Sequence, residues 1–187
     1  MNRLTFSGFA ILFLFFNNAF ASSVALNNFK DIASLKGDWI LAPTNMQEGG
    51  ATKKGPAAKL INTNKTAISF KVIGKGSTVQ ENLLPGTGKE MATMYHCNNF
   101  KNCSTVQAKH YCAKQNQPEL TLDRQTSDKN TISLNCNKDN SVCNSDAGHV
   151  HKIKHELSQG KSHLKTTYTI FAKGKFKKNS IYHFVRK

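Results

Sequence analysis

The segment 149–158 carries three histidines on one predicted face of a β-strand. Successive side chains of a strand point to opposite sides, so His149, His151 and His155 share a face with Ile153, while lysines alternate with them. We expect this face to point into the protein, with His155 at the rim because it lies nearest the end of the strand. Neutral imidazole is a common ligand of zinc, copper and iron, so His149 and His151 are candidate metal ligands.

Other predicted strands also bring polar groups to an apolar face. Glu81 lies between two apolar neighbours, and His110 and Cys112 share the apolar face of their strand. One segment is ambiguous, because Tyr95 is on one face and His96 on the other, and either face could point inward. The candidate ligand-binding residues are therefore Glu81, Tyr95, His96, His110, Cys112, His149 and His151. The candidate ligands of a divalent transition metal among them are Glu81, His110, His149 and His151.

Ionisable groups on an apolar face are costly to bury unless they are hydrogen-bonded, bound to a metal or next to a wet cavity. These alternatives imply different functions for the same side chains. A hydrogen-bonded network would only fix the core, whereas a pocket would use the same side chains to hold a metal or the polar head of a small ligand. The sequence leaves them open.

Five cysteines are present, and four of them bracket short polar segments rich in Asn. Cysteines that face each other across a hairpin reach the Cα separation of about 5.5 Å that a disulfide requires. We therefore predict the disulfides Cys97–Cys103 and Cys136–Cys143. A zinc ribbon is the alternative, but neither pair has C-x-x-C spacing. Cys112 is left as a free thiol, which we expect to be buried.

The elements that must position these side chains are mostly strands. Residues 24–35 have apolar residues at helical spacing, but from Trp39 onward period-two alternation dominates between turn residues. This pattern predicts an all-β protein, an antiparallel up-and-down β-barrel with a short N-terminal helix, because closure removes unpaired strand edges. An immunoglobulin-like sandwich is the alternative. Strands are expected at 39–43, 57–62, 66–74, 76–84, 89–97, 103–113, 119–126, 130–136, 149–158, 163–173 and 179–186.

The first 21 residues are typical of a signal peptide. Arg3 precedes the apolar run 9–16, and Ala19-Phe20-Ala21 is a small-x-small cleavage pattern. We predict cleavage after Ala21, leaving 22–187 as a single domain in the periplasm or outside the cell. The apolar run is shorter than the ~20 residues of a membrane-spanning helix, so no transmembrane segment is expected in the mature chain.

The chain is strongly basic, with 26 Lys and Arg against 11 Asp and Glu and a formal net charge of +15. A charge of this size bears on encounter partners and solubility rather than on fold. The lysines are scattered and no nucleic-acid-binding motif is present, so nucleic acid is not an expected partner. Weak contact with anionic envelope components such as lipopolysaccharide or peptidoglycan is an alternative function, and a solvated cationic surface explains the charge more simply.

Two resemblances to known families are present. Gly37-Asp38-Trp39 is similar to the G-x-W opening of lipocalin-type barrels, which implies that Trp39 plugs the closed end and that Arg186 of the last strand packs over it. The patterns E-M-x-T-x-Y-H over 90–96 and H-Y-C-A-x-x-N-Q-P over 110–118 resemble a group of exported bacterial proteins of unassigned function. That resemblance covers about 35–187 and implies a lipocalin-like, ligand-binding-type barrel, with no established reaction.

The expected function follows from the inward polar groups and the resemblance together. We expect an exported, non-catalytic barrel that binds a small molecule or a divalent transition metal inside. A hydrolase that uses a histidine as general base, with Glu81 or Cys112 as its partner, is a further alternative. The sequence carries no nucleophile elbow, paired-carboxylate motif or H-E-x-x-H to support it.

Overall fold

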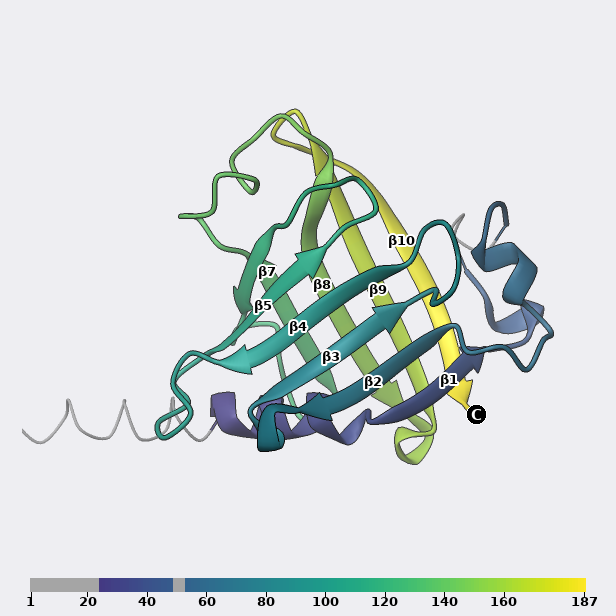
Figure 1. Ribbon diagram of the computed structural model, residues 1–187, viewed down its shortest axis with the longest axis horizontal. Helices are drawn as coiled ribbons and strands as arrows, with labels where there is room; N and C mark the ends of the chain where they lie inside the picture. Colours follow the sequence, from purple (N-terminus) through teal and green to yellow (C-terminus); the bar gives the residue numbers. More distant parts are fainter. Residues whose placement is uncertain (1–23, 49–52) are drawn as a thin grey trace, which may run out of the picture.

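The computed structural model describes residues 24–48 and 53–187, so the predicted signal peptide lies outside the described residues. The described chain forms a closed antiparallel barrel of ten strands, which confirms the predicted fold class (Figure 1). The strands are β1 (Gly37–Leu41), β2 (Ile68–Ile73), β3 (Thr78–Leu83), β4 (Met91–Cys97), β5 (Val106–Tyr111), β6 (Glu119–Leu122), β7 (Thr131–Cys136), β8 (His149–Ser158), β9 (His163–Ala172) and β10 (Lys175–Arg186).

Neighbouring strands in the barrel are consecutive in sequence, except where β1 pairs with β10 and closes the sheet. In the closing ladder Trp39 pairs with Arg186, and Leu41 pairs with Phe184. Short helical turns lie between strands: η1 (Thr44–Met46), η2 (Ala57–Leu60), η3 (Gly74–Gly76) and η4 (Gln159–Lys161). Closure leaves the apolar strand faces packed against one another in the interior.

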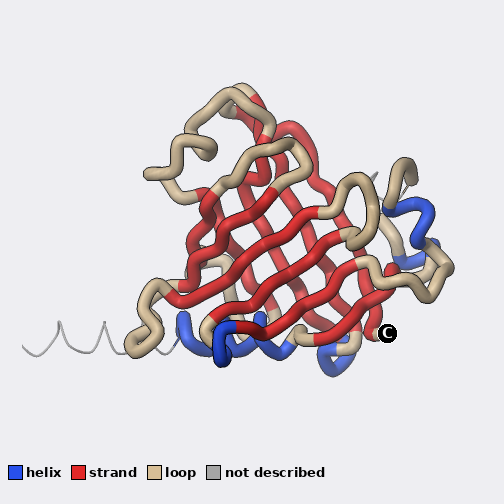
Figure 2. Tube along the Cα trace, in the orientation of Figure 1, coloured by secondary structure: helices blue, strands red, loops and turns tan. Residues whose placement is uncertain are grey.

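The strand expected at 57–62 is wrong, because this segment contains the 3-10 helix η2 (Figure 2). Pro56 precedes it with φ of −60°, a backbone angle that suits a helical turn. Ala57 and Leu60 are buried at a spacing of three, which a helical turn places on one side. The apolar residues Ala57 and Leu60 are therefore as compatible with a helical turn as with a strand.

The N-terminal helix, residues 24–34, lies across one end of the barrel, where the β8–β9 connection is also found (Figure 1). Phe29, Ile32 and Leu35 are buried as the spacing predicts, while Leu26 is exposed and Ala25 is buried in its place. The helix thus caps the apolar interior at this end.

Trp39 and Arg186 occupy the relation that the G-x-W resemblance implies. The guanidinium carbon of Arg186 lies 4.3 Å from the centroid of the Trp39 ring, and Trp39 is fully buried. Arg186 also donates hydrogen bonds to the carbonyl of Ser34, the last helical residue, at 2.9 Å, and to that of Lys36, two residues later, at 3.0 Å. Arg186 therefore covers Trp39 and fixes the end of the helix to β10.

Both predicted disulfides are present. Cys97–Cys103 joins the end of β4 to the β4–β5 loop, with a Cα–Cα distance of 5.2 Å, and Cys136–Cys143 joins the end of β7 to the β7–β8 loop, at 5.7 Å. Cys112 is a free thiol, as predicted, and is half-buried rather than buried. Among the described residues, helices long and apolar enough to cross a membrane are absent.

Candidate functional site

A fully buried carboxylate faces the barrel interior. Burial alternates along β3, and Glu81 lies between Val79 and Leu83 on the buried face, as the alternation predicts. Pairing with the two flanking strands places Phe70 of β2 and Thr93 of β4 opposite Glu81. The sheet itself therefore fixes the position of the carboxylate.

Four side chains direct polar hydrogens at this carboxylate. Tyr168 and Thr93 donate to Oε1 at 2.6 and 3.2 Å. Tyr95 donates to Oε2 at 2.6 Å, and Nε2 of His155 lies 3.3 Å from the same oxygen. Burial is the largest influence on the Glu81 pKa and raises it, but these hydrogen bonds and the attraction of His155 hold the pKa below its ordinary value. Glu81 is therefore an anion whose oxygens are already occupied.

The two tyrosines remain donors over the whole physiological pH range. Burial, followed by the negative charge of Glu81, raises the pKa of both Tyr95 and Tyr168 well above the ordinary value. Their hydroxyl groups therefore stay protonated and keep the carboxylate hydrogen-bonded.

The expectation that His155 is a rim residue is wrong. Its side chain is fully buried, Nε2 lies 3.0 Å from the Tyr95 hydroxyl and Nδ1 lies 3.0 Å from the Thr166 hydroxyl. The ring also meets Phe70 and Tyr95 edge-on. His155 belongs to the Glu81 network through these contacts, and β8 continues for three residues beyond it, to Ser158.

His110 of β5 connects this network to a cavity. Thr93 donates its one hydroxyl proton to Glu81, so its oxygen, 2.9 Å from Nδ1 of His110, accepts a hydrogen bond from the ring. This assignment leaves a lone pair on Nε2. Nε2 is buried and has no hydrogen-bond partner in the described part of the chain. Burial lowers the pKa of His110 to about 4, so the ring is neutral at pH 7.

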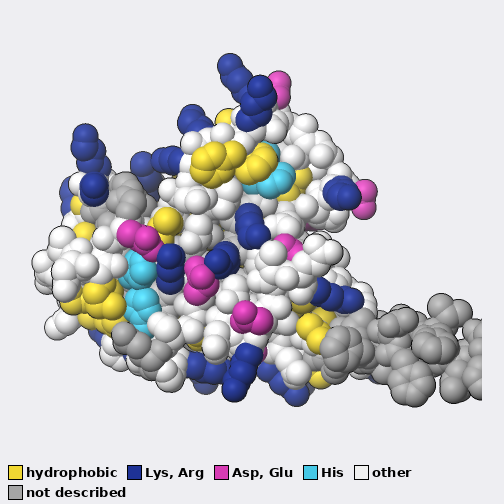
Figure 3. Space-filling view, turned by 180° about the vertical axis from the view of Figure 1, so that it is seen from behind, with side chains coloured by type: hydrophobic (Ala, Val, Ile, Leu, Met, Phe, Trp, Pro, Cys, Tyr) yellow, Lys and Arg dark blue, Asp and Glu magenta, His cyan; other side chains and the backbone are white. Residues whose placement is uncertain are grey.

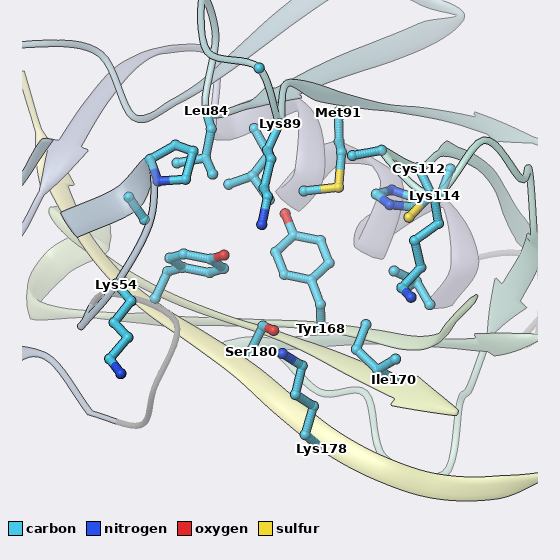
Figure 4. Close-up of a pocket in the computed structure, with 18 of the residues that line it drawn as sticks. Lys54, Leu84, Lys89, Met91, Cys112, Lys114, Tyr168, Ile170, Lys178 and Ser180 are labelled. Atoms are coloured by element: carbon cyan, nitrogen blue, oxygen red, sulfur yellow. The ribbon is translucent and has the colours of Figure 1, made fainter. Parts of the chain in front are cut away.

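The cavity next to His110 has a volume of about 630 Å³ and opens at the barrel end opposite the N-terminal helix (Figure 4). Its wall combines Tyr168 and Tyr182 with aliphatic side chains of several strands. Five lysines from the surrounding loops and from β10 also line it: Lys54, Lys89, Lys114, Lys177 and Lys178. Asp and Glu are absent from the described lining, so the cavity is apolar inside and cationic around it.

The ambiguous face of β4 is settled by the barrel. Thr93 and Tyr95 are fully buried and face inward, whereas His96 is half-buried and contacts the carbonyl of Cys97 through Nδ1, at 3.0 Å. Cys112 lies in the cavity wall with His110, and burial raises the pKa of its thiol. A thiol with a raised pKa is a poor nucleophile at neutral pH.

His149 and His151 lie apart from the Glu81 network. The β8–β9 register skips His151, since Val150 pairs with Ile170 and Lys152 pairs with Thr169. This irregularity shifts the alternation, so Val150 lines the barrel cavity, whereas His151 lines a second hollow with Phe171. Nε2 of His149 and Nδ1 of His151 approach to 3.1 Å.

The structure thus divides the predicted residues between two places. Glu81, Tyr95, His110 and Cys112 belong to the barrel interior and its cavity, whereas His151 lines the second hollow and His149 contacts His151 there. Sequence reasoning missed Thr93, Tyr168 and Thr166 as parts of the network. Tyr168 and Thr166 lie on the same buried face of β9 as Leu164 and Ile170, at a spacing of two residues. The period-two pattern that selected Glu81 therefore also contained the signal for them.

Comparison with known proteins gives no relative on which to base a function. No protein-family model matches the chain. No curated protein and no solved structure matches it either. The barrel, its cavity and the buried polar groups are therefore the features that bear on function.

Proposed function

We propose that the protein is an exported, non-catalytic, lipocalin-like barrel that binds a small anionic molecule with an apolar body in the cavity beside His110. The unpartnered Nε2 of His110 carries this proposal. A buried acceptor that lacks a hydrogen bond costs about 1–3 kcal/mol, which a ligand with an N–H or O–H group at its inner end would recover.

The lining of the cavity supports an amphipathic ligand. Aliphatic side chains such as Met91 and Ile170 lie beside Tyr168, and Figure 4 shows Lys89 and Lys178 near the same ring, with Lys54 farther to one side. A volume of about 630 Å³ is within the usual range for small-molecule sites. The lysines would attract a carboxylate, sulfonate or phosphate and hold it near water, while the apolar part enters the barrel.

A metal is a second candidate for the same nitrogen. Thr93 and Glu81 hold His110 in the tautomer that presents Nε2, as partner groups do for histidines that ligate metals. Glu81 itself is not available as a ligand, because hydrogen bonds already occupy both of its oxygens. A divalent transition metal would therefore have to reach His110 as part of a larger ligand or with water.

The charge distribution favours the cavity over a general polyanion surface. On the face seen in Figure 3, Lys and Arg side chains are spread among acidic and uncharged groups, without one continuous basic patch. Disulfides form and persist in oxidising compartments, which supports the proposed export. The predicted signal peptide supports it independently.

Anilinonaphthalene sulfonate tests the proposal, because it combines an anionic group, an aromatic body and an N–H donor. We expect saturable binding of one molecule per native chain by fluorescence titration. Lys89→Ala with Lys178→Ala should weaken binding at least fivefold, whereas Lys71→Ala with Lys129→Ala removes the same charge away from the cavity and should change little. Equal weakening by both pairs, or no binding to the native chain, would contradict the proposal.

A further inference from the structure

A second group of possible ligands lies outside the barrel cavity. Among the described residues, the side-chain donor atoms of Cys136, His149 and His151 form one cluster, all within 4.8 Å of one another. The residues come from the end of β7 and the beginning of β8. His149 is buried and the other two are half-buried, so the cluster is shielded but can be reached from outside.

The backbone explains why the two histidines converge. Side chains two residues apart in a regular strand share a face but point in parallel directions. Here the register shift between Val150 and Lys152 leaves His151 as the extra residue, and such bulges re-aim side chains. The His151 ring stacks on Phe171, with centroids 3.9 Å apart and an angle of 12° between planes, which holds it in place.

The histidine nitrogens have the geometry of neighbouring metal ligands. Nδ1 of His149 lies 2.8 Å from the carbonyl of Ala147, and donation to that oxygen leaves the Nε2 lone pair directed at the cluster. Nε2 of His149 is 3.1 Å from Nδ1 of His151. Two nitrogens bound to one tetrahedral zinc ion lie about 3.3 Å apart, so a small adjustment admits the ion once the proton that Nδ1 of His151 shares with His149 moves to Nε2 of His151.

The third ligand is controlled by the disulfide. Cys136 is bonded to Cys143, and a disulfide sulfur lacks the thiolate charge that binds zinc strongly. We propose that Cys136, His149 and His151 form a binding site for zinc or a similar divalent ion that becomes complete only when the Cys136–Cys143 disulfide is reduced.

The chemistry of this switch is that of thiol–disulfide exchange. A dithiol reductant gives two electrons and two protons to the Cys136–Cys143 bond and becomes a disulfide itself, leaving two thiols. The Cys136 thiol then loses its proton as its sulfur binds the metal. The hollow beside the cluster, about 510 Å³ and lined by Cys136, Cys143 and His151, offers an entry route and space for water as a fourth ligand.

Cobalt(II) is a suitable probe, because its sulfur-to-metal charge-transfer band reports a thiolate ligand and zinc displaces it. Cys143→Ser frees the Cys136 thiol without a reductant. Cys136→Ser is the matched control, since it breaks the same disulfide and frees the other thiol. Both variants are made with Cys112→Ser, which removes the remaining free thiol.

We expect the variant that keeps Cys136 to bind one cobalt ion with a charge-transfer band, and zinc to abolish the band. The control that keeps Cys143 should bind cobalt at least tenfold more weakly and show no band. Adding His151→Ala to the first variant should also weaken binding at least tenfold. Circular dichroism establishes that each variant is folded. Equal bands in the two variants, or no band in a folded chain that keeps Cys136, would overturn the proposal.

Discussion

At the scale of single residues, the burial of Glu81 is tolerated because the chain surrounds it with donors from three other strands. Tyr95 and Tyr168 approach its two oxygens at 2.6 Å, and Thr93 and His155 complete the set. Hydrogen bonds to a charged group are stronger than neutral ones, and the buried hydroxyl of Tyr168 has Glu81 as its acceptor. Glu81 therefore holds the side chains of three other strands together inside the barrel.

Glu81→Gln tests this role with little change of size. The amide nitrogen would face a hydroxyl group that already needs an acceptor, and the attraction to His155 would be lost. We expect the free energy of unfolding to fall by about 3 kcal/mol, the usual cost of removing one partner from a buried charged network. Urea unfolding measures it. Tyr111→Phe, at an exposed position of β5, should change it by less than about 0.5 kcal/mol.

His110 gives the protein a specific pH dependence. Its pKa of about 4 in the folded chain lies below the ordinary 6.5, so the unfolded chain binds more protons between these values. Stability is therefore full above pH 6.5 and decreases as the pH falls towards 4. His110 alone should remove about 2 kcal/mol between pH 7 and pH 5.

His110→Asn provides the comparison, because it does not titrate and retains a donor for Thr93. Unfolding free energies of both proteins at pH 7 and pH 5 give the difference. The variant should lose less stability on acidification than the native protein, by about 2 kcal/mol. Parallel decreases in the two proteins would show that His110 is not the responsible group. Glu81, whose pKa is lowered, adds its own loss only as the pH falls below about 4.5.

At the scale of elements, strand alternation predicted most of the fold and part of the site. It placed Glu81 and His110 on buried faces correctly, since both strands are regular through these residues. It failed at β8, where one unpaired residue changes the phase of the strand and moves His151 to another surface. A bulge is set by the neighbouring strand, so a single strand's sequence does not reveal it. Similarly, His155 is buried among side chains of other strands, such as Phe70, Tyr95 and Thr166, which the sequence of β8 alone does not place.

Arg186 of β10 contacts both Trp39 of β1 and the end of the N-terminal helix, and substitutions of Arg186 test how much these contacts stabilise the fold. Arg186→Lys keeps the positive charge but loses the flat guanidinium that covers Trp39 and donates hydrogen bonds to the carbonyls of Ser34 and Lys36 at the end of the helix. We expect thermal unfolding to show a loss of about 1–2 kcal/mol. Arg186→Ala should lose slightly more. If the lysine variant were as stable as the native protein, charge rather than geometry would be the stabilising factor.

At the scale of the whole molecule, the barrel has two different ends. The helix and the Trp39–Arg186 pair close one, and the cavity with its lysines opens at the other. Most of the positive charge on the chain is distributed over the surface, but five lysines converge on this opening. The net charge read from the sequence could not reveal this convergence, because the lysines belong to separate loops and to β10.

Binding at the open end should depend on ionic strength. Salt screens exposed charges over roughly 10 Å at 0.1 M, so the Kd of anilinonaphthalene sulfonate should rise at least threefold between 0.05 and 0.5 M sodium chloride. Neutral phenylnaphthylamine has the same rings without the sulfonate and should show an almost unchanged Kd. Identical salt responses of the two probes would mean that the lysines do not recognise the anionic group.

The order of strands in the barrel also has a consequence for folding kinetics. Nine of the ten ladders join consecutive strands and can form from nearby parts of the chain, but the ladder between β1 and β10 joins its two ends. Contacts between distant residues form late, because the intervening chain must first be ordered. The pairing of Phe184, Val185 and Arg186 with β1 is thus the last to form, so every shortened or still-growing chain that lacks these residues has an open sheet and an uncovered Trp39.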